Sequence, residues 1–169
     1  MPENTHNREK LSIVLPCKNE ELALQKCLDE IKETILKHQL DAEVIVVNNH
    51  STDSSIKILE KNLETFPALR IVDQEIEGYG MAYLKGFESA QGEYIFMADA
   101  DGTYNFGDIP RFLDEIKKGY DLVVGNRFTS SFSKDSMPFL HRIGNPILSL
   151  ITRTFFKINI RDIHCGERM

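Results

Sequence analysis

The stretch GEYIFMADADG, residues 92–102, decides the fold class of this chain. Its apolar part, residues 93–98, predicts a buried β-strand, and Gly92 separates that strand from the helix predicted before it. Two carboxylates, Asp99 and Asp101, follow the strand directly. An apolar strand that ends abruptly in charged side chains is typical of a sheet with a binding site at the ends of its strands.

The same pattern, an apolar strand followed by polar residues, recurs on both sides of this stretch. Strands are predicted over residues 11–16, 43–49, 69–73 and 121–125, and helices over residues 20–38, 53–64, 78–90 and 108–119. Because strand and helix alternate throughout, the sequence predicts an α/β domain with a mainly parallel central sheet flanked by helices. Ligands of such sheets bind beyond the carboxyl ends of the strands, so the residues just after each strand form the candidate site.

The composition excludes several classes of protein. The chain has 169 residues, of which 41% are hydrophobic and 27% charged, as in one globular domain. Its formal net charge of -6 argues against an extended face that binds nucleic acid. No apolar run approaches the roughly 18 residues of a membrane-spanning helix, and the polar start MPENTHNREK contains no signal-peptide core. The 3 cysteines match neither a disulfide framework nor a zinc ligand set, so a cytoplasmic location is predicted.

Basic residues gather toward the C-terminal end. Residues 132–169 contain six basic and three acidic side chains, whereas residues 1–131 are strongly acidic. We predict that residues 1–131 form the core and that residues 132–169 form a basic amphipathic segment of the same domain. Within it, residues 139–158 put apolar side chains on a broad helical face beside Arg142, Arg153 and Lys157, which favours the surface of an anionic membrane. The alternative is that this face packs on the domain core or on a following segment.

Asp99 and Asp101 are the strongest local signal for a bound ligand. Two carboxylates that face the same point repel each other, and a divalent cation removes that penalty. Hard oxygen ligands favour Mg²⁺ or Mn²⁺, which completes its shell with substrate phosphates and water. The repulsion also predicts that Asp99→Ala slightly stabilises the metal-free protein. The alternative interpretation is a solvated turn followed by a helix cap.

Five sequence elements, in order across nearly the whole chain, resemble those of family 2 glycosyltransferases. They are LPCKNEE (residues 15–21), similar to the family's P-x-x-N-E opening; VVNNHSTD (46–53), similar to V-V-D-[DN]-x-S-x-D; GYGMA (78–82) with KGF (85–87), similar to G-x-G-x-A-x-x-x-G-f; GEYIFMADAD (92–101), similar to G-e-y-i-x-x-x-D-a-D; and GNRF (125–128), similar to the G-s-R-y element of the dolichol-phosphate mannosyltransferase-like branch. The ending DIHCGER (162–168) resembles the D-x-x-C-G-m-R element of bacterial relatives in that branch. Those relatives usually continue past this point, so we expect the chain to be truncated at its C-terminus.

The resemblance implies a GT-A fold and the inverting transfer of a sugar from a UDP- or GDP-linked nucleotide sugar. The implied acceptor is a polyprenyl phosphate, such as a dolichyl or undecaprenyl phosphate, and the implied metal ligands are Asp99 and Asp101. By matching positions, the nucleotide-sugar site consists of Pro16, Lys18, Glu20, Asn48, Gly80, Asp99, Ala100 and Asp101. Asn48 stands where the family has an aspartate that serves the base, which leaves the identity of the base open.

The resemblance also implies residues on the acceptor side. Arg127 and Arg142 match arginines directed at phosphate groups near the acceptor, a task that suits a permanently charged, bidentate guanidinium. Asp162 matches a family residue that acts in positioning or as a general base. The implied catalytic residues are therefore Asp101, Asp162 and Arg127. A lipid acceptor implies a peripheral location at the cytoplasmic face of the membrane.

Two other functions stay open. One is a non-catalytic module that binds a nucleotide sugar, which Asn48 and the early end of the chain favour. The other is a nucleotidylyltransferase, a class that prefers a glycine- and arginine-rich first loop where this chain has Pro16 to Glu20. The chain lacks the Gly-x-x-x-x-Gly-Lys-Ser/Thr loop of nucleoside triphosphatases and the glycine fingerprint of dehydrogenases, which counts against both classes.

Overall fold

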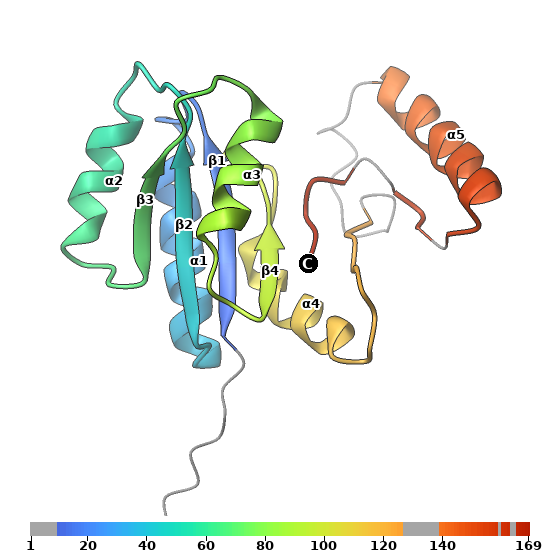
Figure 1. The fold of residues 1–169 in the computed structure, drawn as a ribbon, viewed down its shortest axis with the longest axis horizontal. Coiled ribbons are helices and arrows are strands. Elements are labelled where there is room, and N and C mark those ends of the chain that lie inside the picture. Colours follow the sequence, from blue (N-terminus) through green and yellow to red (C-terminus); the bar gives the residue numbers. More distant parts are fainter. Residues whose placement is uncertain (1–9, 127–138, 159, 163–164) are drawn as a thin grey trace, which may run out of the picture.

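A computed structural model describes residues 10–126, 139–158, 160–162 and 165–169 of the chain (Figure 1). In chain order the elements are β1 (Leu11–Cys17), α1 (Leu24–His38), β2 (Ala42–Asn48), α2 (Ser55–Leu63), β3 (Leu69–Asp73), α3 (Tyr79–Ser89), β4 (Tyr94–Met97), the 3-10 helix η1 (Phe106–Asp108), α4 (Ile109–Ile116) and α5 (Phe139–Phe156). The predicted alternation of strand and helix is confirmed from β1 to α4.

The four strands form one parallel sheet in the order β3-β2-β1-β4. Helices α1 and α2 cover one face of the sheet, and α3 covers the other (Figure 1). Every residue of the central strand β1 is buried, because helices lie on both of its faces. This burial explains why β1 and β2 are continuous apolar runs rather than alternating ones.

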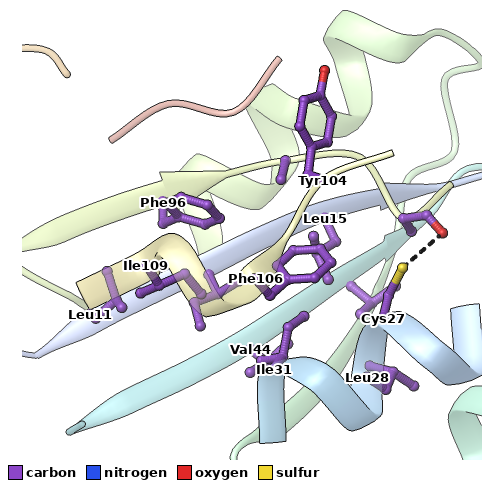
Figure 2. Close-up of a cluster of buried hydrophobic side chains, with 14 of the residues drawn as sticks. Leu11, Leu15, Cys27, Leu28, Ile31, Val44, Phe96, Tyr104, Phe106 and Ile109 are labelled. Atoms are coloured by element: carbon purple, nitrogen blue, oxygen red, sulfur yellow. Dashed lines mark hydrogen bonds between the residues drawn. The ribbon is translucent and has the colours of Figure 1, made fainter. Parts of the chain in front are cut away.

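The larger core lies between the sheet, α1 and the η1–α4 segment (Figure 2). Leu11 and Leu15 of β1, Ile31 of α1 and Phe96 of β4 point into it, and Phe106 of η1 packs among them. The rings of Phe96 and Phe106 meet edge to face, with centroids 6.5 Å apart. The loop that connects β4 to α4 is therefore anchored by its own aromatic residues just beyond Asp99 and Asp101.

Strand β1 continues one residue past the proline at which it was predicted to end. The carbonyl oxygen of Val14 accepts a hydrogen bond from Ala98 on the β4 side, whereas that of Cys17 accepts one from Asn49 on the β2 side. Pro16, two residues after Val14, therefore turns its nitrogen toward β4, which has already ended at Met97. A proline is tolerated in this central strand because no ladder hydrogen bond is lost there.

The predicted fifth strand over residues 121–125 is wrong as a regular strand of the parallel sheet. Val123 and Met169 exchange backbone hydrogen bonds of 2.8 and 2.9 Å, and the N–H of Gly125 donates to the oxygen of Glu167 at 3.0 Å. Arg168 in turn exchanges hydrogen bonds with Met97 at the end of β4. Residues 167–169 thus lie antiparallel between the end of β4 and residues 123–125.

Helix α5 exposes the apolar side chains that the structure describes, from Ile147 onward. Among the described side chains of this helix, Asn145 and Ser149 are buried, at 8% and 2% exposure. Exposed positions along the same helix are Ile147, Leu148, Leu150, Ile151, Phe155 and Phe156. The alternative that this apolar face packs on the domain core is therefore wrong. Within the described residues, we find no helix whose length and hydropathy would let it cross a membrane.

Candidate active site

A cavity of about 280 Å³ opens at the carboxyl edge of the sheet, where the loops after β1, β2 and β4 meet the start of α3. It is lined by Pro16, Cys17, Lys18, Glu20, Asn49, Tyr79, Ala82, Asp99 and Asp101. Five of these, Pro16, Lys18, Glu20, Asp99 and Asp101, are predicted nucleotide-site residues that the structure brings together from separate loops.

The loop after β4 presents its two carboxylates by burying the residue between them. Ala100 is buried, and its carbonyl oxygen accepts a weak hydrogen bond from Sγ of Cys27 at 3.5 Å (Figure 2). Ala100 therefore lies beneath the cavity rather than lining it. Asp101 Oδ1 accepts the N–H of Thr103 at 2.8 Å, a local turn that holds the carboxylate in place.

Two tyrosines of α3 donate to the same oxygen of Asp99. The hydroxyl of Tyr79 lies 2.6 Å from Oδ1 and that of Tyr83 lies 3.1 Å from it. Partial burial of its hydroxyl, and after it the hydrogen bond to Asp99, raises the pKa of Tyr79 to about 12. Burial, and after it the charge of Asp99, raises the pKa of Tyr83 well above its ordinary value. Both hydroxyls therefore remain protonated donors. Sequence reasoning missed this pair, although its i, i+4 spacing after the glycine loop was a signal for a shared helix face.

The cavity is electrostatically negative. Burial raises the pKa of Glu20, and the charges of Asp101, Asp99 and Asp53 raise it further. Within the described ranges, no group of three or more His, Cys, Asp or Glu side chains is arranged to hold a metal ion alone. Mg²⁺ in proteins is commonly held by one or two carboxylates together with substrate phosphates. Asp99 and Asp101 in this cavity fit such an ion, or Mn²⁺, when phosphates supply the remaining oxygens.

Lys18 is the one basic side chain among the described residues that line the cavity. It forms an ion pair with Glu77, which precedes α3, and this hydrogen bond lowers the pKa of Glu77. The ion pair links the loop after β1 to the loop before α3 at the rim of the cavity.

Asn48 and Asn49, at the end of β2, have different tasks. Asn48 donates to Oδ1 of Asp73 at 2.8 Å and accepts the N–H of Ser51 at 3.1 Å, and it does not line the cavity. Asn49 lines the cavity and is buried, and its Oδ1 accepts the N–H of Gly78 at 2.8 Å. Sequence reasoning missed Asn49, which fixes the loop that leads into α3.

The two glycines of this loop also differ. Gly78 has φ 146, a backbone conformation that side chains rarely adopt, so a glycine is needed to enter α3 here. A Cβ at Gly80 would meet nothing within 4 Å, so the packing within the chain does not require a glycine at this predicted nucleotide-site position.

The acceptor-side predictions are described only in part. Arg127 lies outside the described residues, as does the side chain of Arg142. Asp162 is buried at 1% exposure, and its carbonyl oxygen accepts the N–H of Cys165 at 3.2 Å. The segment after it reaches the cavity wall, because a Cβ at Gly166 would lie 2.6 Å from the Tyr104 hydroxyl and 3.1 Å from Asp99 Oδ2. The last sequence element therefore lies against Asp99.

Comparison with curated proteins identifies relatives of this chain. A low-salt glycan biosynthesis hexosyltransferase of Haloferax volcanii is 35% identical over 161 residues, which are 94% of this chain and 38% of that protein. A dolichyl-phosphate hexose transferase of the same organism is 31% identical over 160 residues, which are 95% of this chain and 65% of that protein. The chain thus spans less than two thirds of either relative.

Solved structures share the fold. Glucosyl-3-phosphoglycerate synthase from Mycobacterium tuberculosis matches with a TM-score of 0.70 at 19% identity, over 95% of this chain and 56% of that one. A mannosyltransferase from Pyrobaculum calidifontis, in complex with GDP-Man and Mn²⁺, matches with a TM-score of 0.51 at 28% identity, over 57% of this chain and 28% of that one. The model of glycosyl transferase family 2 matches residues 12–169. With this match, the parallel sheet and the carboxylate pair at its edge, the chain belongs to glycosyltransferase family 2 and has the GT-A fold.

Proposed function

We propose that this chain binds a nucleotide-diphosphate sugar and transfers the sugar, with inversion, to a polyprenyl phosphate in a metal-dependent reaction. The observation that supports this most is the pair Asp99 and Asp101 in a cavity at the carboxyl edge of the sheet. Membership of the family supports the reaction class, and the dolichyl-phosphate hexose transferase among the relatives supports the acceptor.

The charges around the cavity indicate that the donor site needs a cation. Glu20, Asp99 and Asp101 would repel a diphosphate, so the site needs cations beside it. A bound Mg²⁺ or Mn²⁺ would stabilise the negative charge that grows on the leaving diphosphate. Asp99 and Asp101 are the proposed ligands of the ion. We assign Pro16, Lys18 and Glu20 to the nucleoside, together with Asn48 and Gly80.

Attack by the proposed acceptor does not need a strong general base from the protein. A polyprenyl phosphate is already an anion, so its oxygen attacks the anomeric carbon without a strong general base, and positioning dominates. We assign that positioning to Arg127, Arg142 and Asp162, which match the family's acceptor-side elements.

The exposed face of α5 supports a membrane-surface location on the cytoplasmic side. Among its described side chains, the polar Asn145 and Ser149 are buried, while the apolar ones from Ile147 to Phe156 are exposed. Arg153 and Lys157 are exposed at its C-terminal end and suit anionic headgroups. A lipid-linked acceptor has to be met at this interface.

The donor proposal is tested by titrating the chain with UDP- and GDP-linked sugars, with Mn²⁺ and with EDTA. We expect metal-dependent binding that Asp101→Asn abolishes while the circular dichroism spectrum is kept. Asp121→Asn, which removes the same charge at an exposed position outside the cavity, should bind like the parent. Equal metal-dependent affinity of Asp101→Asn and the parent would contradict the assignment.

Release of free nucleoside diphosphate on addition of a polyprenyl phosphate tests the transfer itself. Binding without release would favour the non-catalytic module. Release of pyrophosphate from a nucleoside triphosphate and a sugar phosphate would instead indicate a nucleotidylyltransferase.

The membrane proposal is tested by co-sedimentation with anionic vesicles. We expect the vesicles to pull down more parent protein than Arg153→Glu/Lys157→Glu. The control Lys57→Glu/Lys61→Glu makes the same charge change on exposed positions of α2 and should sediment like the parent. Equal sedimentation of the parent and the α5 variant would exclude an electrostatic contribution of α5 to membrane binding.

A further inference from the structure

We infer that Tyr79 and Tyr83 are positioning residues for Asp99, and that they hold its carboxylate in one orientation beside a bound nucleotide sugar. This inference rests on the proposed function, because it assigns Asp99 to the donor site. It starts from the two tyrosine hydroxyls that meet at one carboxylate oxygen, Asp99 Oδ1, at 2.6 and 3.1 Å. An aspartate on a loop can rotate about two side-chain bonds, and two donors at one oxygen hold it in a single orientation.

The two donors are rigidly mounted. Tyr79, Tyr83 and Phe87 follow one another at i, i+4 spacing on one face of α3. The rings of Tyr79 and Tyr83 meet edge to face with centroids 5.0 Å apart, and those of Tyr83 and Phe87 are 5.7 Å apart. Gly86 on the neighbouring face lets α3 approach β1 closely, because a Cβ there would lie 2.3 Å from Cγ1 of Val14. The helix therefore holds the hydroxyls at a defined distance from the end of β4.

The second oxygen of Asp99 lies beside the C-terminal segment. A Cβ at Gly166 would lie 3.1 Å from Oδ2, so a glycine there lets this segment approach Asp99 closely. Asp99 lines the cavity together with Asp101. Tyr79 lines the cavity as well, so the orientation of Asp99 that the two hydroxyls hold is the one that a ligand in the cavity would meet.

A purely structural explanation fits Tyr83 but not Tyr79. Tyr83 is 5% exposed, so its hydroxyl needs a protein partner, and Asp99 supplies one. Tyr79 is 59% exposed, so water could satisfy its hydroxyl without any contact to Asp99. Tyr79 nevertheless makes the shorter of the two hydrogen bonds and lines the cavity. Burial alone therefore does not account for both donors.

The test compares Tyr79→Phe, Tyr83→Phe and the double variant with the parent. Calorimetric titration with UDP and with GDP, each in the presence of Mn²⁺, measures affinity on protein that circular dichroism shows to be folded. Loss of one hydrogen bond should weaken binding of the nucleotide that the parent prefers by about 2- to 13-fold per hydroxyl. Tyr120→Phe is the matched control, because Tyr120 is also 59% exposed and does not line this cavity.

A ligand-free double-mutant cycle tests the contact itself. In urea unfolding, the effect of Tyr83→Phe should be smaller in an Asp99→Ala background than in the parent, because the hydroxyl then has no carboxylate to meet. Unchanged nucleotide affinity in both single variants, a loss no larger than that of Tyr120→Phe, or strict additivity in the cycle would each overturn the inference. Failure of the parent to bind either nucleotide with Mn²⁺ would overturn the proposed function, and the positioning role with it.

Discussion

Two buried glutamates show how strongly the surroundings of a residue decide its behaviour. Burial by itself would raise the pKa of Glu43, but hydrogen bonds from Ser12, Gln91 and Arg70 outweigh that effect and lower it. Within the described parts of the chain, Oε1 of Glu167 has no hydrogen-bond partner. Burial, reinforced by the charge of Asp108, raises the pKa of Glu167 to about 7. This residue stands at the m position of the D-x-x-C-G-m-R pattern.

We predict that Glu167→Met stabilises the chain at neutral and higher pH. The folded state holds the Glu167 proton up to about pH 7, whereas an unfolded glutamate releases it near its ordinary value of 4.5. The folded state is therefore favoured most at low pH, and this stability is lost as the pH rises through 7. Urea unfolding at about pH 8 should show a gain of about 1–3 kcal/mol for Glu167→Met.

The control for this prediction is Glu60→Met, at an exposed position of α2. It should leave the pH dependence of the unfolding free energy unchanged, whereas Glu167→Met should flatten it between about pH 4.5 and pH 7. An unchanged pH dependence in Glu167→Met would show that Glu167 does not titrate in this range.

A second residue-scale prediction concerns Asp99→Ala in the metal-free protein. The carboxylate pair alone favours a slight stabilisation, because a repulsion is removed. The structure adds an opposing effect, since the buried hydroxyl of Tyr83 loses its acceptor. We expect the second effect to dominate, with a loss of about 1–3 kcal/mol in urea unfolding. A higher unfolding free energy than that of the parent would show that repulsion is the larger effect.

At the scale of the element, α3 connects the packing of the sheet to the site. The helix lies on β1 and β2 through Gly86, and a Cβ there would also come within 3.2 Å of Cγ2 of Val47. The start of the helix is fixed by a polar contact instead, because Oδ1 of Asn49 accepts a hydrogen bond from the N–H of Gly78. The same helix presents Tyr79, Tyr83 and Ala82 to the cavity region.

Gly86→Ala and Gly80→Ala are predicted to have opposite effects on stability. The added methyl group of Gly86→Ala collides with Val14, so we expect a loss of about 1–3 kcal/mol. Gly80→Ala places the same methyl group in open space within a helix, so we expect a gain of up to about 1 kcal/mol. Thermal unfolding of the two variants beside the parent measures both effects. A loss of stability in both variants would mean that the collision with Val14 does not explain the effect of Gly86→Ala.

At the scale of the whole molecule, the site is a product of segments that only the fold brings together. The loops after β1, β2 and β4 and the start of α3 each supply part of the cavity wall. No single segment contains both the basic Lys18 and the carboxylate pair. A ligand that contacts all of these segments should therefore hold the folded molecule together.

We predict that UDP or GDP with Mn²⁺ raises the melting temperature, and that EDTA removes this gain. A ligand at 100 times its dissociation constant adds about 2.7 kcal/mol to the unfolding free energy, enough for a shift of a few degrees. Differential scanning fluorimetry with nucleotide alone, metal alone and both together measures the effect. An equal shift with nucleotide alone would contradict the need for the ion.

The sequence by itself determined the order of the elements from β1 to α4 and the positions of Asp99 and Asp101. Continuous apolar runs can be buried in a parallel sheet, and helical periodicity between them leaves few other arrangements. The carboxyl ends of parallel strands share one edge, so polar residues after separate strands could be placed near one another without coordinates. Lys18, Glu20 and Asp101 were found in this way.

Only the tertiary structure decided the partners that such residues meet. Met169 pairs with Val123, and Arg168 with Met97, because a hydrogen bond between distant segments leaves no local pattern in either of them. The side of α5 that faces outward was equally open, since an amphipathic pattern is the same whether its apolar face is covered or exposed. Asn49 and Tyr79 escaped notice for the same physical reason: the tasks of both side chains depend on residues that the fold, not the neighbouring sequence, brings within hydrogen-bonding distance.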